Sequence, residues 1–351
     1  MKKLFLIGYY GYDNMGDEVL LSSITRFLKE QGGIAIKVLS YNAHDTERVH
    51  GVEGVSRSKG LGLIKQILQT DILVSGGGSI LQDGTSSKSL YYYMGILGLG
   101  KLLGKKVYLM GNGYGPVTHG YNRMMLKFLL KNVDGIVSRD QDAYEAFARY
   151  QPKRLFNGVD CVFLQRSDQT THADKPSKRP YVVMSLRPWK NDLAILEAVS
   201  DTIDKLDRLG YDTVLVPMKQ PDDSLFSRPL LEKGGHVSLL EHDIEALKQC
   251  LEHASFTIGM RLHALILSTI AHTPFIAVSY DPKVASFARQ VDQKVGCTTE
   301  SISSEKLSDA IDDMLMNLEK YRMLLNENLV DLSKTATEQM ELLMTWINDC
   351  N

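Results

Sequence analysis

Three arginines, Arg139, Arg187 and Arg261, each come directly after a short apolar run rich in β-forming residues, such as Gly135–Ser138. A guanidinium is planar and can hold a carboxylate or a phosphate through two parallel hydrogen bonds. A single arginine of this kind is usually part of a surface ion pair. Three at equivalent positions favour an anion-binding site.

His263 lies two residues after Arg261. Side chains at positions i and i+2 diverge in the middle of a helix. Both can face one ligand only if Arg261 stands at the entry to a helix and His263 in its first turn, where backbone N–H groups also attract anions. An imidazole titrates near neutral pH and can serve as general acid or base. Gly259 belongs to the same junction, and Lys283 is either a turn residue or a further cation of the site.

Glycines mark three other strand ends, at residues 8–18, 75–79 and 111–116. Glycine lets backbone N–H groups approach an anion without a Cβ in the way. In a parallel sheet the carboxyl ends of the strands share one edge, where open α/β folds bind ligands. We therefore interpret these loops as part of a binding site instead of simple chain reversals. The residues expected to line it are Tyr10, Asp13, Asn14, Gly77, Gly78, Ser79, Asn112 and Tyr114.

The composition is typical of a globular protein of about two domains, with 351 residues, 44% hydrophobic and 23% charged, and a net charge of −2. No overall basic field indicates a nucleic-acid partner. The four cysteines form no C-x-x-C pair and the histidines show no metal-ligand spacing, so we expect no disulfide framework and no tightly bound metal.

The apolar run after Met1 is too short for a signal peptide, and no stretch approaches the ~20 apolar residues of a membrane helix. We expect a cytoplasmic location, with peripheral contact at the inner face of the plasma membrane allowed.

Strand-like and helical segments alternate along the chain, which predicts an α/β fold with two Rossmann-type domains whose mostly parallel sheets face each other across a cleft. We expect the first domain at residues 1–165, a polar linker with two prolines at 166–180 and the second domain at 181–303. Residues 304–351 are expected to form helices that pack on the domains.

The apolar segment 91–106 has two interpretations. It could be an interfacial helix that touches lipid, or a core helix that precedes the strand beginning at Val107. The core helix is favoured because the glycines in the segment leave it without a distinct apolar face opposite a polar one.

Six motifs together resemble the polysaccharide pyruvyl transferase family, most closely its CsaB-type branch of cell-wall polymer synthesis. They are G-Y-Y-G-Y-D-N-M-G-D-E, S-G-G-G-S-I-L-Q-D, G-N-G-Y-G-P, V-S-R-D, S-L-R-P-W and G-M-R-L-H-A. The resemblance runs from residue 2 to about residue 285 in the family's order and spacing. It implies a GT-B-like fold with the acceptor side in the N-terminal domain and the donor side in the C-terminal domain.

The resemblance also implies a reaction. Phosphoenolpyruvate would be the donor and co-substrate, with no other cofactor, and pyruvate would be placed as a ketal on a pair of sugar hydroxyls. For the CsaB-type branch the acceptor would be the 4,6-hydroxyl pair of an N-acetylmannosamine unit in a lipid-linked precursor. The pyruvylated secondary cell wall polymer would then anchor surface-layer (S-layer) proteins. The third glycine loop departs from related sequences, which often read Q-G-I-G-P where this chain has Asn112 and Tyr114.

The residues fit that chemistry. Phosphoenolpyruvate carries roughly three negative charges, and Arg139, Arg187 and Arg261, with Lys283 and the backbone at Gly259, are expected to hold it. His263 is the expected general acid or base, and Asp13 the expected base for the sugar hydroxyl. Two alternatives remain: a GT-B nucleotide-sugar glycosyltransferase of cell-surface polysaccharide synthesis and a non-catalytic anion-binding protein. No clear acidic motif for ribose recognition follows Ser279.

Overall fold

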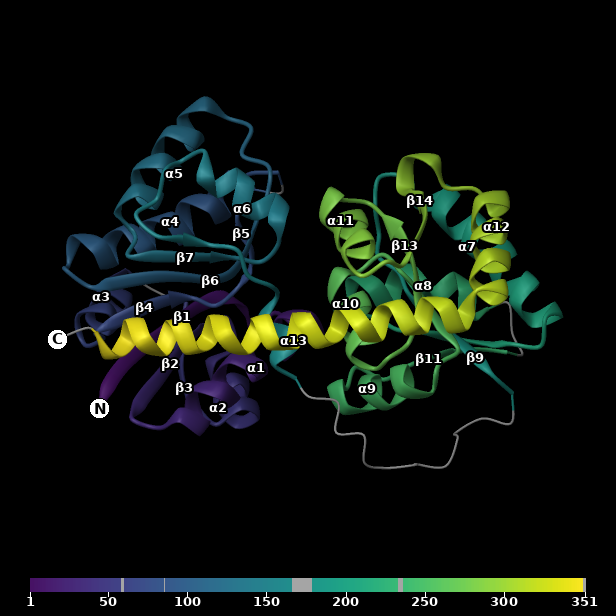
Figure 1. Cartoon of the computed structure of the whole chain (residues 1–351), viewed down its shortest axis with the longest axis horizontal. Helices are drawn as coiled ribbons and strands as arrows, with labels where there is room; N and C mark the ends of the chain where they lie inside the picture. The colour runs from purple at the N-terminus through teal and green to yellow at the C-terminus, as the bar shows by residue number, and fades with distance from the viewer. Residues whose placement is uncertain (58–59, 85, 166–178, 233–235, 350–351) are drawn as a thin grey trace. The chain divides into compact units, whose positions relative to one another are not determined.

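The computed structural model describes residues 1–57, 60–84, 86–165, 179–232 and 236–349 (Figure 1). The chain divides into two compact units. Unit 1 consists of Met1–Leu164 together with the chain from Leu332 onward, and unit 2 is Gln165–Asp331. Of the linker predicted at 166–180, residues 166–178 lie outside the described residues.

Unit 1 is built on one parallel sheet in the order β3-β2-β1-β4-β6-β7-β8, with β5 paired to β6. The strand order reverses direction at β1, as in doubly wound folds, because the chain moves outward to β3 and then crosses to β4 on the other side of β1. The strands are β1 (Lys2–Tyr10), β2 (Ile34–Ser40), β3 (Glu53–Ser56), β4 (Ile72–Ser75), β5 (Gly78–Leu81), β6 (Lys106–Tyr114), β7 (Gly135–Ser138) and β8 (Leu155–Phe156).

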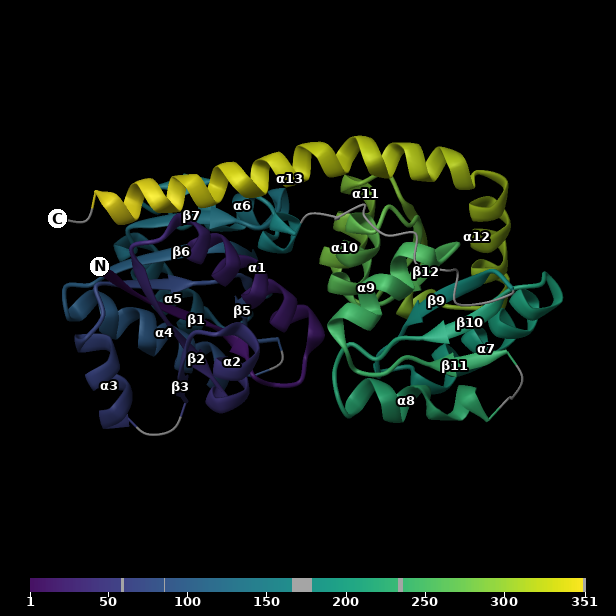
Figure 2. The same ribbon diagram turned by 90° about the horizontal axis from the view of Figure 1, so that it is seen from below.

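Helices cover both faces of this sheet (Figures 1 and 2). Their bounds are α1 (Met15–Gln31), α2 (Ala43–His50), α3 (Gly60–Leu68), α4 (Ser87–Leu102), α5 (Gly120–Asn132) and α6 (Gln141–Ala148), followed by the 3₁₀ turn η1 (Cys161–Leu164). Side chains from α3, α4, α5 and α6 form one core cluster with Phe5 and Ile7 of β1. Successive side chains of a strand alternate between the two faces, so Leu4 and Leu6, also fully buried, belong to the opposite face.

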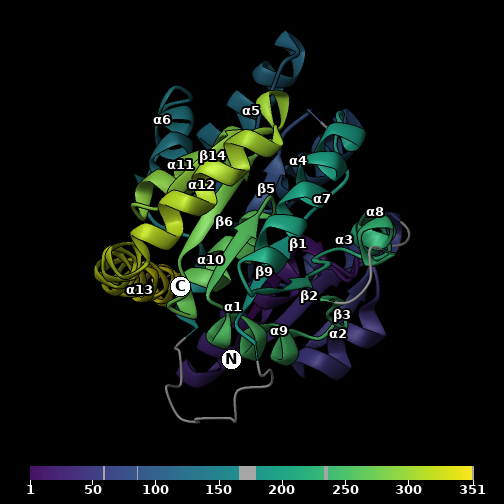
Figure 3. The ribbon, with the colours of Figure 1, turned by 90° about the vertical axis from the view of Figure 1, so that its right-hand side faces the viewer.

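Unit 2 has a second, fully parallel sheet in the order β11-β10-β9-β12-β13-β14. Its strands are β9 (Tyr181–Ser185), β10 (Asp212–Leu215), β11 (Val237–Leu239), β12 (Phe256–Gly259), β13 (Phe275–Ser279) and β14 (Lys294–Thr298). Its helices are α7 (Asp192–Arg208), α8 (Asp222–Leu231), α9 (Ile244–His253), α10 (Leu262–Ile270), α11 (Pro282–Gln290) and α12 (Ser304–Met316), with the 3₁₀ turn η2 (Thr299–Ser301) before α12. Figure 3 shows α7 and α12 side by side, and both contribute to the same core cluster.

The predicted α/β class and the two Rossmann-type domains with parallel sheets are confirmed. The predicted bounds of β7, Gly135–Ser138, agree with the structure residue for residue. Helix α4 is a core helix, as favoured from its glycines, since Leu90, Tyr93 and Leu97 are fully buried. The elements that sequence reasoning did not find are short: α2, β3, α3, β5, α8, β11, α11 and β14.

The tail expected at 304–351 forms α12 and one long helix, α13 (Leu318–Asn348), and α13 contributes to both units. Its last turns complete the core of unit 1. The Trp346 ring is 3% exposed and stacks on Tyr108 of β6 with ring centroids 4.9 Å apart. The Gln339 amide accepts a hydrogen bond from the Val159 N–H and donates one to the Val159 carbonyl. The C-terminal helix is therefore a structural part of the first domain.

Replacing Trp346 by alanine should lower the free energy of unfolding by about 3–5 kcal/mol, because a buried ring is lost and a cavity is left. Urea titration followed by circular dichroism measures the change. Val330→Ala on the same helix is the matched control, since Val330 is 68% exposed and should change stability by less than about 0.5 kcal/mol. Equal effects of the two substitutions would contradict the role given to Trp346.

Candidate functional site

Three neighbouring strands of unit 2 deliver polar side chains to one edge of its sheet. Strands β9, β12 and β13 are adjacent and parallel, and Gly259 at the end of β12 pairs in register with Ser185 at the end of β9. Arg187, Arg261 and Tyr280 follow the ends of these three strands. The carboxyl edge of the sheet thus holds the cationic residues predicted for the second domain.

Arg261 is held in place by a buried carboxylate. Asp223 of α8 has a side chain with no exposed surface, and it accepts hydrogen bonds from the backbone N–H groups of Met218 and Lys219 at 3.1 and 3.0 Å. The Arg261 Nε donates to Asp223 at 3.0 Å and Nη2 donates to the second carboxylate oxygen. This bidentate pair leaves Nη1 of a rigidly held guanidinium for a further acceptor.

Arg187 lies against aromatic rings. Its guanidinium carbon is 4.3 Å from the centroid of Tyr280 and 5.0 Å from that of Trp189, and Lys283 Nζ is 5.6 Å from the Tyr280 centroid. Burial by itself raises the pKa of the Tyr280 phenol, but the positive charges of Lys283, Arg187 and Arg261 outweigh it and hold the pKa below its usual value. Arg187 and Lys283 thus both lie against the Tyr280 ring, and the charge of Arg261 also acts on its phenol.

His263 stands where the sequence analysis expected it. Arg261 is the N-cap residue of α10 and His263 is the second residue of that helix. The Arg261 side chain makes no capping hydrogen bond, so no N-cap side chain occupies the first-turn N–H groups of α10. The imidazole thus sits next to the arginine and the positive end of a helix dipole.

Three more polar atoms are buried near the loops after β9 and β14. Ser185 Oγ, Trp189 Nε1 and Thr299 Oγ1 have no hydrogen-bond partner within the described part of the chain. The Asn191 amide donates to the Thr299 carbonyl at 3.3 Å, which places η2 beside the Trp189 loop. Buried polar atoms without a partner are rare in folded proteins and are a feature of sites that bind polar ligands.

Unit 1 contains the third predicted arginine. Arg139, 6% exposed, donates from Nε to Asp140 at 3.0 Å and from Nη1 to Ser79 Oγ at 3.3 Å. A Cβ at Gly113 would lie 2.5 Å from Arg139 Nη2, so only glycine allows this approach. Arg139 therefore joins two glycine loops, those after β4 and in β6, and it belongs to a different unit from Arg187 and Arg261.

Two residues predicted to line the acceptor side are buried instead. The Tyr10 hydroxyl donates to the Gly76 carbonyl at 2.8 Å, and burial raises the pKa of this phenol well above its usual value. The Asn112 amide donates to Ser75 Oγ and to the carbonyls of Gly77 and Gly78 at 2.9, 3.0 and 3.3 Å. Gly77 and Gly78 have φ values of +89° and +71°, which side-chain-bearing residues rarely adopt. Tyr10 and Asn112 thus shape the triple-glycine loop from inside.

The first glycine loop is held by Glu18, which the sequence analysis did not single out. Glu18 accepts a hydrogen bond from the Gly11 N–H at 2.7 Å and contacts His50 Nε2 at 2.9 Å. Asn14 is the N-cap of α1 and accepts from the Gly16 N–H. Asp13 is exposed and has a left-handed φ of 52°. Of this loop, Asp13 is the residue that presents a carboxylate to solvent.

Tyr114, also expected to line the acceptor side, is half-buried at the end of β6. Its hydroxyl lies 2.7 Å from that of Tyr150, and its ring makes an edge contact with Phe147 at 5.6 Å between centroids. Burial and the bond with Tyr150 raise the pKa of this phenol. The hydroxyl of Tyr114 is therefore engaged within unit 1.

Arg57 and a group of tyrosines form a feature that sequence reasoning missed. Arg57 follows β3, its guanidinium carbon is 4.2 Å from the centroid of Tyr92, and it donates to the hydroxyls of Tyr12 and Tyr93. The rings of Tyr9, Tyr12 and Tyr41 stack in series at 4.1 and 4.7 Å between centroids, and Tyr41 is 66% exposed. The sequence pattern did not indicate a strand before Arg57, because β3 has only four residues and one of them is glycine.

The predicted residues therefore fall into two groups, each at the carboxyl edge of one sheet. Unit 2 holds Arg187, Gly259, Arg261, His263 and Lys283; unit 1 holds Tyr10, Asp13, Asn14, Gly77, Gly78, Ser79, Asn112, Tyr114 and Arg139. In the described ranges of the chain, no group of three His, Cys, Asp or Glu side chains is arranged to hold a metal ion.

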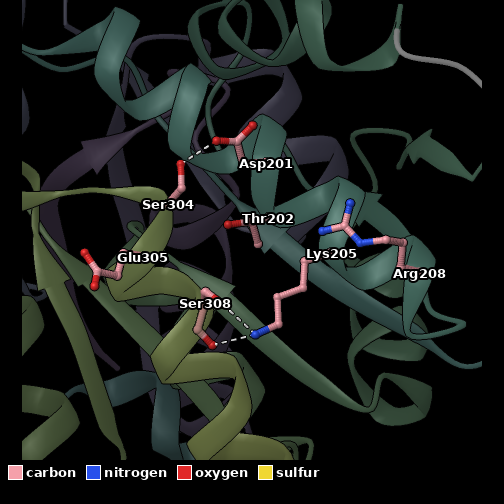
Figure 4. A pocket seen from close by; sticks show the side chains of 7 residues that line it. All are labelled: Asp201, Thr202, Lys205, Arg208, Ser304, Glu305 and Ser308. Atoms are coloured by element: carbon pink, nitrogen blue, oxygen red, sulfur yellow. Dashed lines mark hydrogen bonds between the residues drawn. The ribbon is translucent and has the colours of Figure 1, made fainter.

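A pocket of about 280 Å³ on unit 2 lies elsewhere, between α7 and α12 (Figure 4). Lys205 at its wall donates to Ser308 and pairs with Asp312 at 2.6 Å, and Ser304 donates to Asp201. Lys205 is thus already paired with an acid, and none of the residues that line the pocket belongs to the candidate site.

Comparison with known proteins assigns the family. The model of the polysaccharide pyruvyl transferase family matches residues 14–282, more than three quarters of the chain. This chain belongs to the polysaccharide pyruvyl transferase family. It is a transferase enzyme, and the family resemblance stated from its motifs is confirmed.

One relative of this chain is the amylovoran biosynthesis protein AmsJ of Erwinia amylovora. The two sequences are 22% identical over 297 residues, which cover 73% of this chain and 68% of the relative. Similar solved structures include UDP-GlcNAc 2-epimerase of Neisseria meningitidis bound to UDP-GlcNAc and a glycosyltransferase of Rickettsia africae. Their TM-scores are 0.67 and 0.66, at 10% and 14% identity over 98–100% of each chain. At this identity the likeness shows the fold, which is the expected GT-B-like one.

Replacing Arg261 by alanine should destabilise this transferase by about 3–5 kcal/mol, because the buried Asp223 carboxylate loses its counter-charge. The double variant Asp223→Asn/Arg261→Ala should recover part of that loss, since no unpaired charge remains. Arg187→Ala is the matched control and should cost only about 0.5–2 kcal/mol, the value of its contacts with aromatic rings. Urea titration measures all three. A single variant as stable as the double one would refute the pair's role.

Proposed function

We propose that this enzyme transfers pyruvate from phosphoenolpyruvate to a pair of sugar hydroxyls as a ketal and releases phosphate. The observation that carries the proposal is the placement of Arg187 and Lys283 against Tyr280, with Arg261 after the end of the adjacent strand β12, in a member of the pyruvyl transferase family. Phosphoenolpyruvate is small and carries roughly three negative charges, two on the phosphate and one on the carboxylate.

The electrostatics of the unit 2 site support such a donor. Asp223 uses two of the nitrogens of Arg261, and Asp281 lies 3.7 Å from Lys283, so these acids fix the cations in place. Arg187 contacts rings instead of a carboxylate, and its charge is available to a ligand. The first-turn N–H groups of α10 add donors for a phosphate. We propose that these groups hold the donor without a metal ion, so that a chelator should leave activity unchanged.

Ketal formation requires a proton on the methylene carbon of the donor, which makes the adjacent carbon electrophilic. One sugar hydroxyl then bonds to that carbon, phosphate leaves, and the second hydroxyl closes the ring. Of the two hydroxyl protons released, one replaces the proton added to carbon and the other leaves with phosphate. We propose His263 as the general acid or base, Asp13 as the base for the sugar hydroxyl, and Arg139 as a further anion-binding group.

The acceptor side is proposed for unit 1. The stack of Tyr9, Tyr12 and Tyr41 ends in an exposed ring beside the first glycine loop, and such a ring can pack on the apolar face of a sugar. The acceptor we propose is the 4,6-hydroxyl pair of N-acetylmannosamine in a lipid-linked cell-wall polymer precursor. The pyruvylated polymer would anchor S-layer proteins, and the reaction would take place on the cytoplasmic side of the membrane.

A nucleotide-sugar glycosyltransferase is the rival function, since the fold is shared with enzymes that bind UDP-sugars. Thermal shift separates the two. Stabilisation by phosphoenolpyruvate but not by UDP- or GDP-sugars supports the pyruvyl transferase, and the reverse result would favour the rival.

The deciding experiment measures phosphate release from phosphoenolpyruvate with and without a lipid-linked ManNAc–GlcNAc acceptor, with mass spectrometry of the product. Release that depends on the acceptor, with a product heavier by one ketal pyruvate, supports the donor, the reaction and the acceptor class together. Failure with every acceptor, combined with no binding of phosphoenolpyruvate, would overturn the proposal.

His263→Ala should lower kcat by about 10²–10⁴-fold, the usual contribution of one general acid–base group, with little change in donor affinity. Steady-state kinetics and a phosphoenolpyruvate titration measure the two effects. His44→Ala is the control, because the His44 side chain is 87% exposed. Normal turnover by the His263 variant would remove this residue from the mechanism.

Tyr41→Ala should raise the acceptor KM by about tenfold, equivalent to ~1.4 kcal/mol, since an exposed aromatic ring that covers a sugar contributes an energy of this order. Tyr41→Phe keeps the ring and should behave like the unaltered enzyme. The KM for phosphoenolpyruvate should stay constant in both. An unchanged acceptor KM in Tyr41→Ala would exclude the stack from acceptor binding.

A further inference from the structure

The distribution of charge along the sequence is strongly uneven. Residues 84–133 contain no Asp or Glu but seven Lys and Arg. The other 33 Lys and Arg share the rest of the chain with all 42 acids. The acid-free segment comprises α4, β6 and α5 of unit 1, so these two helices carry basic residues and no acid.

Helix α5 has apolar side chains on two faces. Leu126, Leu129 and Leu130 are buried in the core of unit 1. Tyr121, Met124 and Phe128 recur at the i, i+3, i+7 spacing of one stripe and are 62%, 61% and 73% exposed. Single exposed apolar residues are normal on a surface, but three in one helical stripe form a patch that marks an interaction surface.

The same exposed side of α5 carries Arg123, Lys127 and Lys131, spaced four residues apart. Lys88 and the 42%-exposed Tyr91 of α4 lie alongside, because the Tyr91 hydroxyl donates to Asn122 of α5 at 2.7 Å. Over the residues that the structure describes, no ion pair joins any of these four cations to an acid.

The remaining cations of the segment are engaged already. Lys101 and Lys106 both pair with Asp134, at 2.6 and 3.9 Å, and Lys105 donates to the Leu68 carbonyl at 2.9 Å. The free positive charge is therefore concentrated beside the exposed apolar stripe, on the face formed by α5 and the start of α4.

We propose that this α5 surface, made of Tyr121, Arg123, Met124, Lys127, Phe128 and Lys131, docks on an anionic lipid bilayer. A stripe of Tyr, Met and Phe flanked by Lys and Arg, with no acid, has the composition of helices that lie in the interfacial layer of a membrane. Each cation near an anionic surface adds to the attraction, and the apolar side chains enter the boundary of the acyl chains. A nucleic-acid partner would account for the cations, but it would not account for an exposed stripe of three apolar side chains.

No helix in the part of the chain that the structure describes has the length and hydropathy to cross a bilayer. The docking itself stands on the charges and exposed side chains of unit 1. Its use in catalysis rests on the proposed function, because a lipid-linked acceptor would be presented at such a surface.

Co-sedimentation of the full chain with vesicles tests the docking. The vesicles contain phosphatidylcholine alone or phosphatidylcholine with phosphatidylglycerol, at low and at physiological salt. One variant reverses charge, Lys127→Glu/Lys131→Glu, and a second removes apolar contacts, Met124→Ser/Phe128→Ser. The matched control is Lys320→Glu/Met323→Ser on α13, where both side chains are exposed.

The unaltered protein and the control should bind the anionic vesicles at least about tenfold more tightly than the neutral ones, and salt should weaken this binding. The charge variant should lose at least about tenfold, since each cation at an anionic surface is worth about fivefold. The apolar variant should lose binding with little change in salt dependence. Equal binding by all four proteins, no binding to anionic vesicles, or preferential binding to RNA or to an acidic polypeptide would overturn the proposal.

Turnover of a water-soluble acceptor separates this inference from the proposed function. The variants should turn it over like the unaltered protein while losing activity on acceptor embedded in vesicles. Vesicle binding without turnover of any acceptor would overturn the proposed function but would still support the docking surface.

Discussion

Every strand pair described in both sheets is parallel, and this constraint organises the rest of the molecule. Parallel pairing forces each strand–helix junction of a unit to the same edge, so residues far apart in sequence meet there without a dedicated binding loop. In unit 2 this brings together Arg187, Arg261 and Lys283, which are separated by up to 96 positions in the sequence numbering. In unit 1 it brings Asp13, Ser79 and Arg139 to one edge. The chemistry of the site is thus a consequence of topology.

Within that frame, two buried polar side chains and one partly buried one give the site its rigidity. Asp223 holds Arg261, Asn112 holds the triple-glycine loop, and Glu18 holds the first loop. Each satisfies backbone N–H or carbonyl groups of a loop or the charge of an arginine, so removing it would leave a buried polar group unpaired. The groups proposed to touch substrates are therefore supported by others that do not.

Sequence reasoning predicted the positions that depend on local pattern. Arg261 and His263 could be placed at a helix entry because an apolar run with glycine precedes them and an apolar helix follows. Asp223 could not be found, because its partner lies 38 residues away in sequence and no local signal joins the two. Arg57 was hidden behind a four-residue strand with exposed positions. Tyr10 and Asn112 looked like ligand-facing residues because they are polar and beside glycines, but their burial depends on neighbouring strands that only the fold reveals.

The division of α13 between the units has a consequence for how the protein is made. Unit 1 lacks part of its core until Gln339 and Trp346 are in place, although its sheet is complete by residue 156. Domains usually fold as they leave the ribosome, the N-terminal one first. Here the core of the first unit cannot be completed when its sheet has been synthesised. Tyr108 and the backbone around Val159 lack their helical partner until almost two hundred further residues have been added. The order of synthesis and the order of completion are reversed, and the second unit finishes before the first.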